Sequence, residues 1–211
     1  MKYKCIIFDC DGVLVDSEKI SIGTMVAMAA NIGVKLDEES ATRLFLGKSL
    51  AFCFNYIQSH SDKKLPDNFE EEFRIRSFEA FKSDLKPIEG VHELLNQLEV
   101  PFCVASNGPA NKIRLNLTAT ELIDKFEGNI FSAYDINSFK PDPGLYLHAA
   151  KTMGYEVKDC VVIEDSAVGV QAALSGGFDV FGFAQKTNQA HLEQLEIPVF
   201  DTMANLLKLL Q

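Results

Sequence analysis

Two aspartates separated by one residue follow an apolar stretch near the start of the chain. The letters IIFDCDG begin at Ile6, so Asp9 and Asp11 come at the end of a run that reads as a buried β-strand. A buried carboxylate is costly unless it is paired or binds a cation. Alternate residues of an extended chain point to the same side, so both carboxylates would face the same way. The pair indicates a metal site or a catalytic pair, although DG alone is also a common turn signal.

Polar residues also follow later apolar runs of the chain. They come at the ends of FCVASN and CVVIED and, after IFSAYDI, in the segment SFKPDP. The residues concerned are Ser106, Asn107, Lys140, Glu164 and Asp165. Sites in open α/β sheets form at the carboxyl ends of the strands. We therefore expect this set to converge on the first two aspartates.

This combination of acids, a hydroxyl, an amide and a lysine suits phosphoryl transfer. Mg²⁺ prefers oxygen ligands, and a metal ion together with Lys140 would reduce the repulsion between an attacking carboxylate and a phosphate dianion. Asp9 would be the nucleophile and would form an aspartyl-phosphate. Asp11 would protonate the leaving alcohol and later deprotonate the hydrolytic water.

The strands expected to position these residues are short and mostly apolar throughout. They are Lys4–Asp9, Pro101–Asn107, Ile130–Ile136, Cys160–Asp165, Phe178–Phe183 and Ile197–Phe200. Such runs are typical of strands covered on both faces. Helical patterns alternate with them, including Val91–Val100, Gly144–Gly154 and Val168–Gly177, and the last two stop at glycines. The alternation predicts an α/β fold, a Rossmann-like parallel sheet with helices on both faces.

Residues 17–86 interrupt this rhythm with patterns that read as helical throughout. The helical patterns are Ser17–Gly33, Asp37–Gly47, Ser49–His60 and Asn68–Leu85. Seven of the 16 phenylalanines lie between Phe45 and Phe81, as expected for the core of a small helical bundle. We expect residues 1–16 and 87–211 to form the catalytic core, and residues 17–86 to form an inserted, all-α helical cap.

Composition narrows the class of protein further. The 211 residues suffice for one domain, with or without an insertion. A net charge of −10 disfavours nucleic acid as a partner, because phosphate backbones reward clustered lysine and arginine.

The chain starts on a strand-like run rather than a signal peptide, and no apolar run approaches the roughly 18 residues that span a bilayer. Five scattered cysteines without a CxxC motif indicate a reducing compartment. We expect a cytoplasmic protein without membrane contact, a monomer or a weak dimer.

The segments DCDGVLVD, SN, KPDP and EDSAVGVQAA resemble, in order and spacing, the four motifs of the haloacid dehalogenase-like (HAD) superfamily. The resemblance covers essentially the whole chain and includes the helical cap of the C1-capped branch. It implies Asp9 as nucleophile and Asp11 as acid and base. It implies that Mg²⁺ is held by Asp9, the backbone carbonyl of Asp11 and Asp165, with Glu164 in support. The phosphate contacts that it implies are Ser106, Asn107 and Lys140.

The expected activity is that of a Mg²⁺-dependent phosphoric monoester hydrolase. Its substrate would be a small phosphorylated metabolite, a sugar or sugar-acid phosphate such as 6-phosphogluconate. A phosphomutase of the β-phosphoglucomutase type is an alternative, but such enzymes usually carry a histidine where this chain has Ser21 and a basic residue where it has Leu50. A dehalogenase would lack the second acid, Asp11, and need no metal. A catalytically silent binding module would usually lack a nucleophile or a metal ligand.

Three residues of the helical segment are candidates for substrate selection: Glu18, Gly47 and Lys48. The letters LGKS around Gly47 suggest a phosphate-binding loop, but Thr42 stands where the full pattern needs a glycine. Gly47 and Lys48 would instead form a cap loop that faces the site, or an exposed turn. Glu18 would contact the substrate or stabilise the first helix through its dipole. The four histidines lack metal-ligand spacing, and Cys10 is expected to pack in the core.

Overall fold

The computed structural model describes residues 2–45, 48–185 and 188–211, without the side chains of residues 190 and 191. The chain divides into two compact units. The first consists of Met1–Asp16 together with Lys86–Gln211, and the second of Ser17–Leu85. Each unit has its own hydrophobic core.

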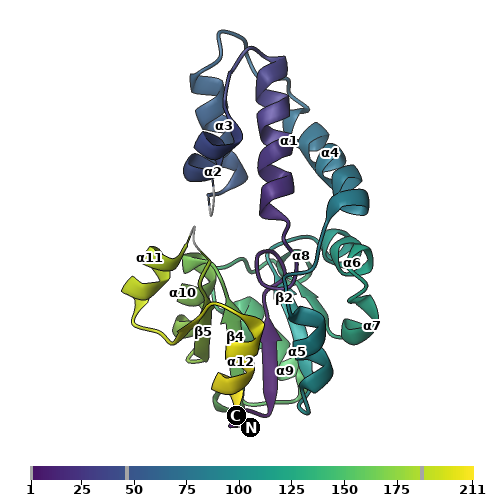
Figure 1. The fold of residues 1–211 in the computed structure, drawn as a ribbon, viewed down its shortest axis with the longest axis vertical. Coiled ribbons are helices and arrows are strands. Elements are labelled where there is room, and N and C mark those ends of the chain that lie inside the picture. Colours follow the sequence, from purple (N-terminus) through teal and green to yellow (C-terminus); the bar gives the residue numbers. More distant parts are fainter. Residues whose placement is uncertain (1, 46–47, 186–187) are drawn as a thin grey trace. The chain divides into compact units, whose positions relative to one another are not determined.

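The first unit contains a six-stranded sheet in which all neighbouring strands are parallel (Figure 1). The strands are β1 (Cys5–Phe8), β2 (Phe102–Ser106), β3 (Ile130–Ser132), β4 (Cys160–Glu164), β5 (Asp179–Phe183) and β6 (Val199–Phe200). Their order is β3-β2-β1-β4-β5-β6, so the chain reverses its direction of travel across the sheet between β1 and β4. This reversal is the topological switch point at which ligands bind in such sheets. The predicted Rossmann-like fold class is confirmed.

Helices cover both faces of this sheet. Ile7 of β1 packs on one face with α9 (Gly144–Met153) and α10 (Ala167–Ser175). The next residue, Phe8, points to the other face, where its ring meets the edge of Phe126 from α7 (Ile123–Phe126). The remaining helical elements of this unit are α5 (Val91–Gln97), α6 (Ala110–Ala119), α8 (Ala133–Ile136), η1 (Val157–Asp159), α11 (Gln189–Leu192), η2 (Glu193–Leu195) and α12 (Met203–Leu210).

The third strand is shorter than the sequence predicts. The expected strand Ile130–Ile136 ends at Ser132, and its second half is the single turn of α8. The hydroxyl of Ser132 accepts a hydrogen bond from the backbone N–H of Tyr134 at 3.2 Å, which is an N-terminal helix cap. Asn137 adopts a left-handed conformation with φ of 51° and ends the turn. The local cap therefore overrides the strand propensity of this segment.

The second unit is built from helices, as the sequence predicts. They are α1 (Glu18–Asn31), α2 (Glu38–Phe45), α3 (Leu50–Ser59) and α4 (Phe69–Asp84). Aromatic rings form much of its interior: Phe54 meets Phe69 and Phe73 edge to face, with ring centres 5.3 and 5.9 Å apart. Phe52 is an exception, because 45% of it is exposed. The interpretation of the phenylalanine-rich segment as a helical core is otherwise confirmed.

The chain leaves and re-enters the first unit at neighbouring positions. The backbone N–H of Asp16 donates to the carbonyl of Lys86 at 3.0 Å, and Val15 forms an isolated antiparallel bridge with Pro87. The N–H of Ile88 donates to the carbonyl of Leu14, also at 3.0 Å. A short ladder of backbone hydrogen bonds therefore joins the two crossing segments.

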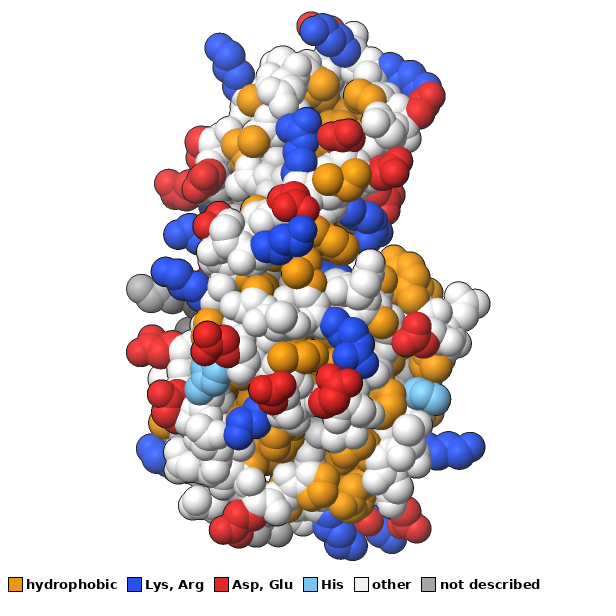
Figure 2. All heavy atoms as spheres, turned by 90° about the vertical axis from the view of Figure 1, so that its right-hand side faces the viewer, with side chains coloured by type: hydrophobic (Ala, Val, Ile, Leu, Met, Phe, Trp, Pro, Cys, Tyr) orange, Lys and Arg blue, Asp and Glu red, His pale blue; other side chains and the backbone are white. Residues whose placement is uncertain are grey.

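Three surface and core features bear on the class of protein. Within the described ranges, no helix has the length and apolar character needed to cross a membrane. Acidic and basic side chains alternate over the face shown in Figure 2 rather than gathering into a basic patch. The five cysteines are free and buried.

Candidate functional site

The loop after β1 brings the first aspartates to the end of β4. Gly12 has a φ of 83°, in the left-handed region that favours glycine. A Cβ atom at Gly12 would lie 2.0 Å from Oδ2 of Asp165, so no other residue fits here without displacing that carboxylate. The backbone N–H of Leu14 closes the turn by donating to the carbonyl of Cys10 at 2.9 Å. Cys10 itself is fully buried, which confirms the expected packing role.

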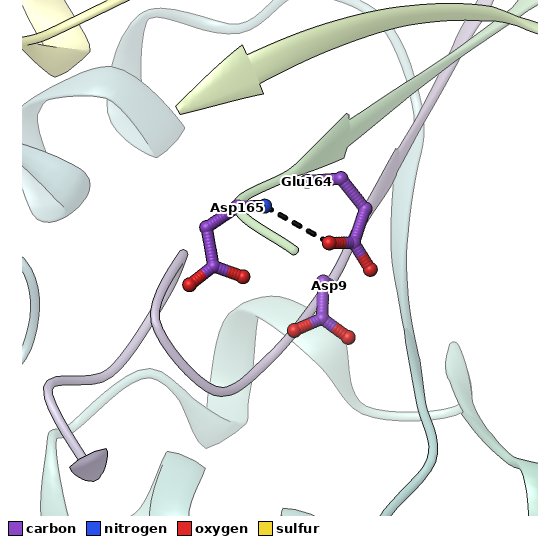
Figure 3. Close-up of side chains that lie close together, drawn as sticks. All are labelled: Asp9, Glu164 and Asp165. Carbon is purple, nitrogen blue, oxygen red and sulfur yellow. Dashed lines mark hydrogen bonds between the residues drawn. The ribbon is translucent and has the colours of Figure 1, made fainter. Parts of the chain in front are cut away.

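Three carboxylates gather at the switch point between β1 and β4. Asp9, Glu164 and Asp165 each offer an oxygen atom, and these atoms all lie within 4.8 Å of one another. Figure 3 shows the three side chains close together, with Asp9 on the chain that follows β1 and with Glu164 and Asp165 following one another at the end of β4. Such a set of hard oxygen donors fits a cation such as Mg²⁺. The predicted acidic cluster is present, with Asp11 outside it.

A buried lysine bridges two of these acids. Nζ of Lys140 lies 2.5 Å from Oδ1 of Asp9 and 2.7 Å from Oε1 of Glu164. Burial raises the pKa of Asp9 to about 7, against the opposing charge of Lys140. Burial works in the other direction on the lysine, but the charges of Asp9 and Glu164 outweigh it and raise the pKa of Lys140. The lysine therefore stays charged beside the expected nucleophile.

Glu164 is occupied by hydrogen-bond donors of the protein. Its Oε1 accepts from Lys140 and from the hydroxyl of Tyr146 at 2.9 Å. Its Oε2 accepts from the backbone N–H groups of Asp165 and Ser166 and from the hydroxyl of Ser166, at 2.8–2.9 Å. Burial opposes ionisation, but Lys140 and the bonds from Ser166 outweigh it and lower the pKa of Glu164. This carboxylate is arranged to hold Lys140 in place.

Two residues around Glu164 were not singled out in the sequence. Tyr146, on α9, is fully buried, and its ring centre lies 4.7 Å from Nζ of Lys140. Gly169, on α10, leaves the space that the glutamate occupies, because a Cβ there would lie 1.7 Å from Oε1 of Glu164. In the sequence, these residues are marked only by their distance from predicted site residues: Tyr146 comes six residues after Lys140, and Gly169 comes five residues after Glu164.

The side chain of Asn107 pairs with the backbone of Lys140. Its Oδ1 accepts from the backbone N–H of Lys140 at 2.9 Å, and its Nδ2 donates to the carbonyl of the same residue at 3.3 Å. The hydroxyl of Ser106 accepts from the N–H of Gly108 at 3.1 Å. The Asn107 amide therefore holds the loop that carries the lysine, and Ser106 is its neighbour in the chain.

Asp11 faces helix α6 instead of the other acids. Its Oδ2 lies 2.7 Å from Nζ of Lys112, and its Oδ1 accepts from Nδ2 of Asn116 at 3.1 Å. Burial opposes the charge of Lys112, but the Asp11 carboxylate outweighs this effect and raises the pKa of the lysine. Lys112 and Asn116 were not predicted to be site residues. In the sequence they are marked only by their four-residue spacing, one helical turn, in the segment that follows the strand run ending at Asn107.

The candidates for substrate selection lie in the second unit. Glu18 is the first residue of α1, and Gly47 lies outside the described residues. Lys48 is exposed, with Nζ 5.8 Å from the ring centre of Phe52. Ser49 begins α3 as its N-cap, since its hydroxyl accepts from the N–H of Phe52 at 3.2 Å. Lys48 and Ser49 therefore lead into an ordinary capped helix.

A Rossmann-like sheet with buried acids and a lysine at its switch point defines an α/β enzyme. The chain belongs to the haloacid dehalogenase-like hydrolases, whose family model matches residues 3–177. It is 33% identical over 206 residues to the 6-phosphogluconate phosphatase of Escherichia coli, covering 97% of this chain and 93% of that protein. The expected superfamily and the expected enzyme class, a phosphatase, are confirmed.

Two solved structures share the fold along nearly the whole chain. A haloacid dehalogenase-like protein of Agrobacterium tumefaciens superposes with a TM-score of 0.89 at 28% identity, covering 99% of this chain and 97% of that one. A HAD family hydrolase of Deinococcus radiodurans, solved with bound phosphate and sodium, gives a TM-score of 0.83 at 29% identity. That comparison covers 97% of this chain and 93% of the other.

Proposed function

We propose that the protein is a Mg²⁺-dependent phosphatase that hydrolyses a small sugar phosphate or sugar-acid phosphate. The observation that carries this proposal is the buried ammonium group of Lys140, held within 2.7 Å of both Asp9 and Glu164 at the switch point of the sheet. A fixed cation next to a carboxylate serves a reaction in which that carboxylate attacks an anion. The phosphatase named as a relative, and the phosphate bound in the hydrolase from Deinococcus radiodurans, support the same class of ligand.

The first half of the reaction forms an aspartyl-phosphate. A carboxylate oxygen of Asp9 attacks the phosphorus atom, and the bond between phosphorus and the alcohol oxygen breaks. Asp11 gives its proton to that oxygen, so that a neutral alcohol leaves. Lys140 stabilises negative charge on the transferring group and stays in place because Glu164 and Asn107 hold its side chain and backbone.

The second half releases phosphate. A water molecule attacks the same phosphorus atom, Asp11 accepts a proton from the water, and the bond between phosphorus and the Asp9 oxygen breaks. Inorganic phosphate leaves, and both aspartates return to their starting states. A single acid and base thus serves both halves.

Asp9 and Asp165, with the backbone carbonyl of Asp11, would hold the Mg²⁺ ion. A Cβ at Gly12, the residue after Asp11, would lie 2.0 Å from Oδ2 of Asp165, so the Asp165 carboxylate lies against this loop. When bound, the ion supplies charge that neutralises the phosphate dianion and lowers the pKa of Asp9. Glu164, with its five protein donors, acts as support rather than as a direct ligand.

The helical unit Ser17–Leu85 would act as a cap that selects the organic part of the substrate. Glu18, Gly47 and Lys48 remain our candidates for this selection, with Lys48 suited to an anionic group such as a sugar-acid carboxylate. We further propose a cytoplasmic monomer or weak dimer that acts on a free metabolite rather than on nucleic acid or at a membrane.

The test is a screen of phosphorylated metabolites with purified protein and Mg²⁺, with released inorganic phosphate as the readout. We expect turnover of sugar or sugar-acid phosphates, no turnover in excess EDTA, and recovery when Mg²⁺ is restored. Asp9→Asn keeps the side-chain shape and removes the attacking charge, so it should be almost inactive. Full activity of Asp9→Asn, or of the chelated enzyme, would refute the mechanism. Isomerised substrate without phosphate release would indicate a phosphomutase.

A further inference from the structure

Helix α6 presents two side chains, one turn apart, to the carboxylate of Asp11. Lys112 and Asn116 are four residues apart and therefore lie on the same face of the helix. Each binds a different oxygen: Nζ of Lys112 lies 2.7 Å from Oδ2, and Nδ2 of Asn116 lies 3.1 Å from Oδ1. Contacts to both oxygens fix the rotation of a carboxylate as well as its position.

Asn116 is an unusual residue for this position. The residue is fully buried, and no described residue donates a hydrogen bond to its Oδ1. While Asp11 is ionised, the Asn116 amide cannot be reversed to relieve this, because a carboxylate only accepts hydrogen bonds and needs Nδ2 toward it. A buried acceptor without a partner destabilises the fold, so stability alone would favour an apolar side chain. The amide must serve the carboxylate that it contacts.

The carboxylate of Asp11 needs such restraint because of where it lies. Asp9 and Asp11 are alternate residues at the end of one strand, and a cation among Asp9, Glu164 and Asp165 would attract both of them. If Asp11 joined the cation, it would no longer be available to exchange a proton with the leaving alcohol. In the structure, Asp11 instead contacts α6 and lies outside the acidic cluster.

We propose that Lys112 and Asn116 are positioning residues that clamp the Asp11 carboxylate and keep it from becoming an additional metal ligand. The clamp assigns different tasks to the two aspartates of the strand end, with Asp9 for attack and metal binding and Asp11 for proton transfer. The inference rests on the proposed phosphatase function and extends it to residues that touch Asp11 rather than the reacting phosphate.

The test compares Lys112→Met and Asn116→Leu with the control Arg114→Met. Arg114 lies on the same helix and also pairs with a carboxylate, that of Glu127, but the pair is exposed and outside the site. Each variant is assayed with p-nitrophenyl phosphate, whose leaving group needs no proton, and with an alkyl phosphate, whose leaving group does. Because general acid catalysis is worth about 100- to 10,000-fold, we expect kcat for the alkyl ester to fall by about 10- to 100-fold more than for the aryl ester.

Further readouts separate positioning from a structural role. KM should stay near the wild-type value, and Arg114→Met should behave like the wild type with both esters. Lys112→Arg, which keeps a cation beside the carboxylate, should recover part of the loss. Calorimetric titration with MgCl₂ should show tighter binding to Lys112→Met than to the wild type, because the released carboxylate joins the ion. Asn116→Leu should melt no lower than the wild type, because it removes the unpartnered amide oxygen.

Several results would overturn the clamp. Equal losses for the two esters would show that neither residue acts through proton transfer. A raised KM with an unchanged kcat would make Lys112 a substrate contact. If Lys112→Met does not fold, the ester comparison with Asn116→Leu decides the question. If the wild type hydrolyses neither ester, the proposed function fails. MgCl₂ binding tests the clamp separately: affinity that is unchanged in both Lys112→Met and Asn116→Leu would refute it.

Discussion

Replacement of Gly169 by alanine should destabilise the protein, although the same change usually stabilises a helix. Gly169 is the third residue of α10, and a glycine-to-alanine change inside a helix typically gains about 1 kcal/mol. Here the new Cβ would lie 1.7 Å from Oε1 and 2.0 Å from Cδ of Glu164. Glu164 is fully buried, so its carboxylate has to move within a packed site.

The size of the effect follows from what Glu164 would lose. A shift of Oε1 breaks the hydrogen bonds from Lys140 and Tyr146, and a bond to a charged group contributes about 1.5–3 kcal/mol. Two such bonds amount to about 3–6 kcal/mol, so the net loss of stability is about 2–5 kcal/mol after the gain in helix propensity. For a chain of this size, the melting temperature should fall by about 4 °C or more. The displaced Lys140 should also reduce turnover.

Gly23→Ala is the matched control. Gly23 lies inside α1, and the nearest atom to its new Cβ would be Oε1 of Glu38, at 3.9 Å. This variant should therefore gain up to about 1 kcal/mol. Thermal melts in EDTA and in Mg²⁺, followed by phosphate release, make the comparison. A Gly169→Ala protein that is as stable and active as the Gly23→Ala protein would refute the view that Glu164 is a packed support for Lys140.

Three further predictions address the centre and the cap. Tyr146→Phe removes one of the five hydrogen-bond donors to Glu164. It should lower kcat/KM by about 10-fold, the equivalent of about 1.5 kcal/mol, for aryl and alkyl esters alike. Unchanged kinetics would show that the hydroxyl is not needed. Burial raises the pKa of Asp9 from 3.8 to about 7, so the folded protein binds this proton more tightly than the unfolded chain does. The free energy of unfolding of the metal-free protein should therefore fall as the pH rises from about 4 to about 7. Mg²⁺ affinity should rise with pH and level off above about 7, because the ion must displace the proton of Asp9. Calorimetry at several pH values gives the affinity, and buffers of different ionisation enthalpy reveal the released proton. An affinity that does not change with pH would contradict this prediction. Lys48→Ala should lower kcat/KM for a sugar-acid phosphate by about 10- to 150-fold, the equivalent of about 1.5–3 kcal/mol, and spare p-nitrophenyl phosphate. Lys140→Ala should lower kcat/KM for both substrates. Equal losses for Lys48→Ala on the two substrates would remove it from substrate selection.

The sequence predicts the strand ends well because their signal is local. An apolar run that stops at an acid indicates both a buried strand and the point at which it ends, and Asp9 and Asp165 lie directly after β1 and β4. The strand Ile130–Ile136 was predicted too long because apolar and aromatic residues continue beyond Ser132. Its end depends on a single side-chain cap at Ser132, which hydrophobic periodicity does not reveal.

Pairings between distant side chains could not be predicted in the same way. The phosphate contact expected of Asn107 stays a prediction, but the pairing of its amide with the backbone of Lys140, 33 residues away, was not foreseen. Asp11 meets Lys112 across 101 residues of sequence. The sequence pattern shows which side chains reach the same edge of the sheet. Which of them form hydrogen bonds or ion pairs with one another depends on where the helices are placed and how they pack.

The backbone ladder around Asp16 and Lys86 has a consequence for how this chain can change. The hydrogen bond from Asp16 to Lys86, and the bridge between Val15 and Pro87, close residues 17–85 into a loop whose ends are already fixed by the first unit. The entropy of closing a loop grows only slowly with its length. Insertions, deletions or replacement of the helices between these two points would therefore cost the sheet little. The segment that we propose to select the substrate could therefore change in length and composition while the residues proposed to act on the phosphate ester keep their positions.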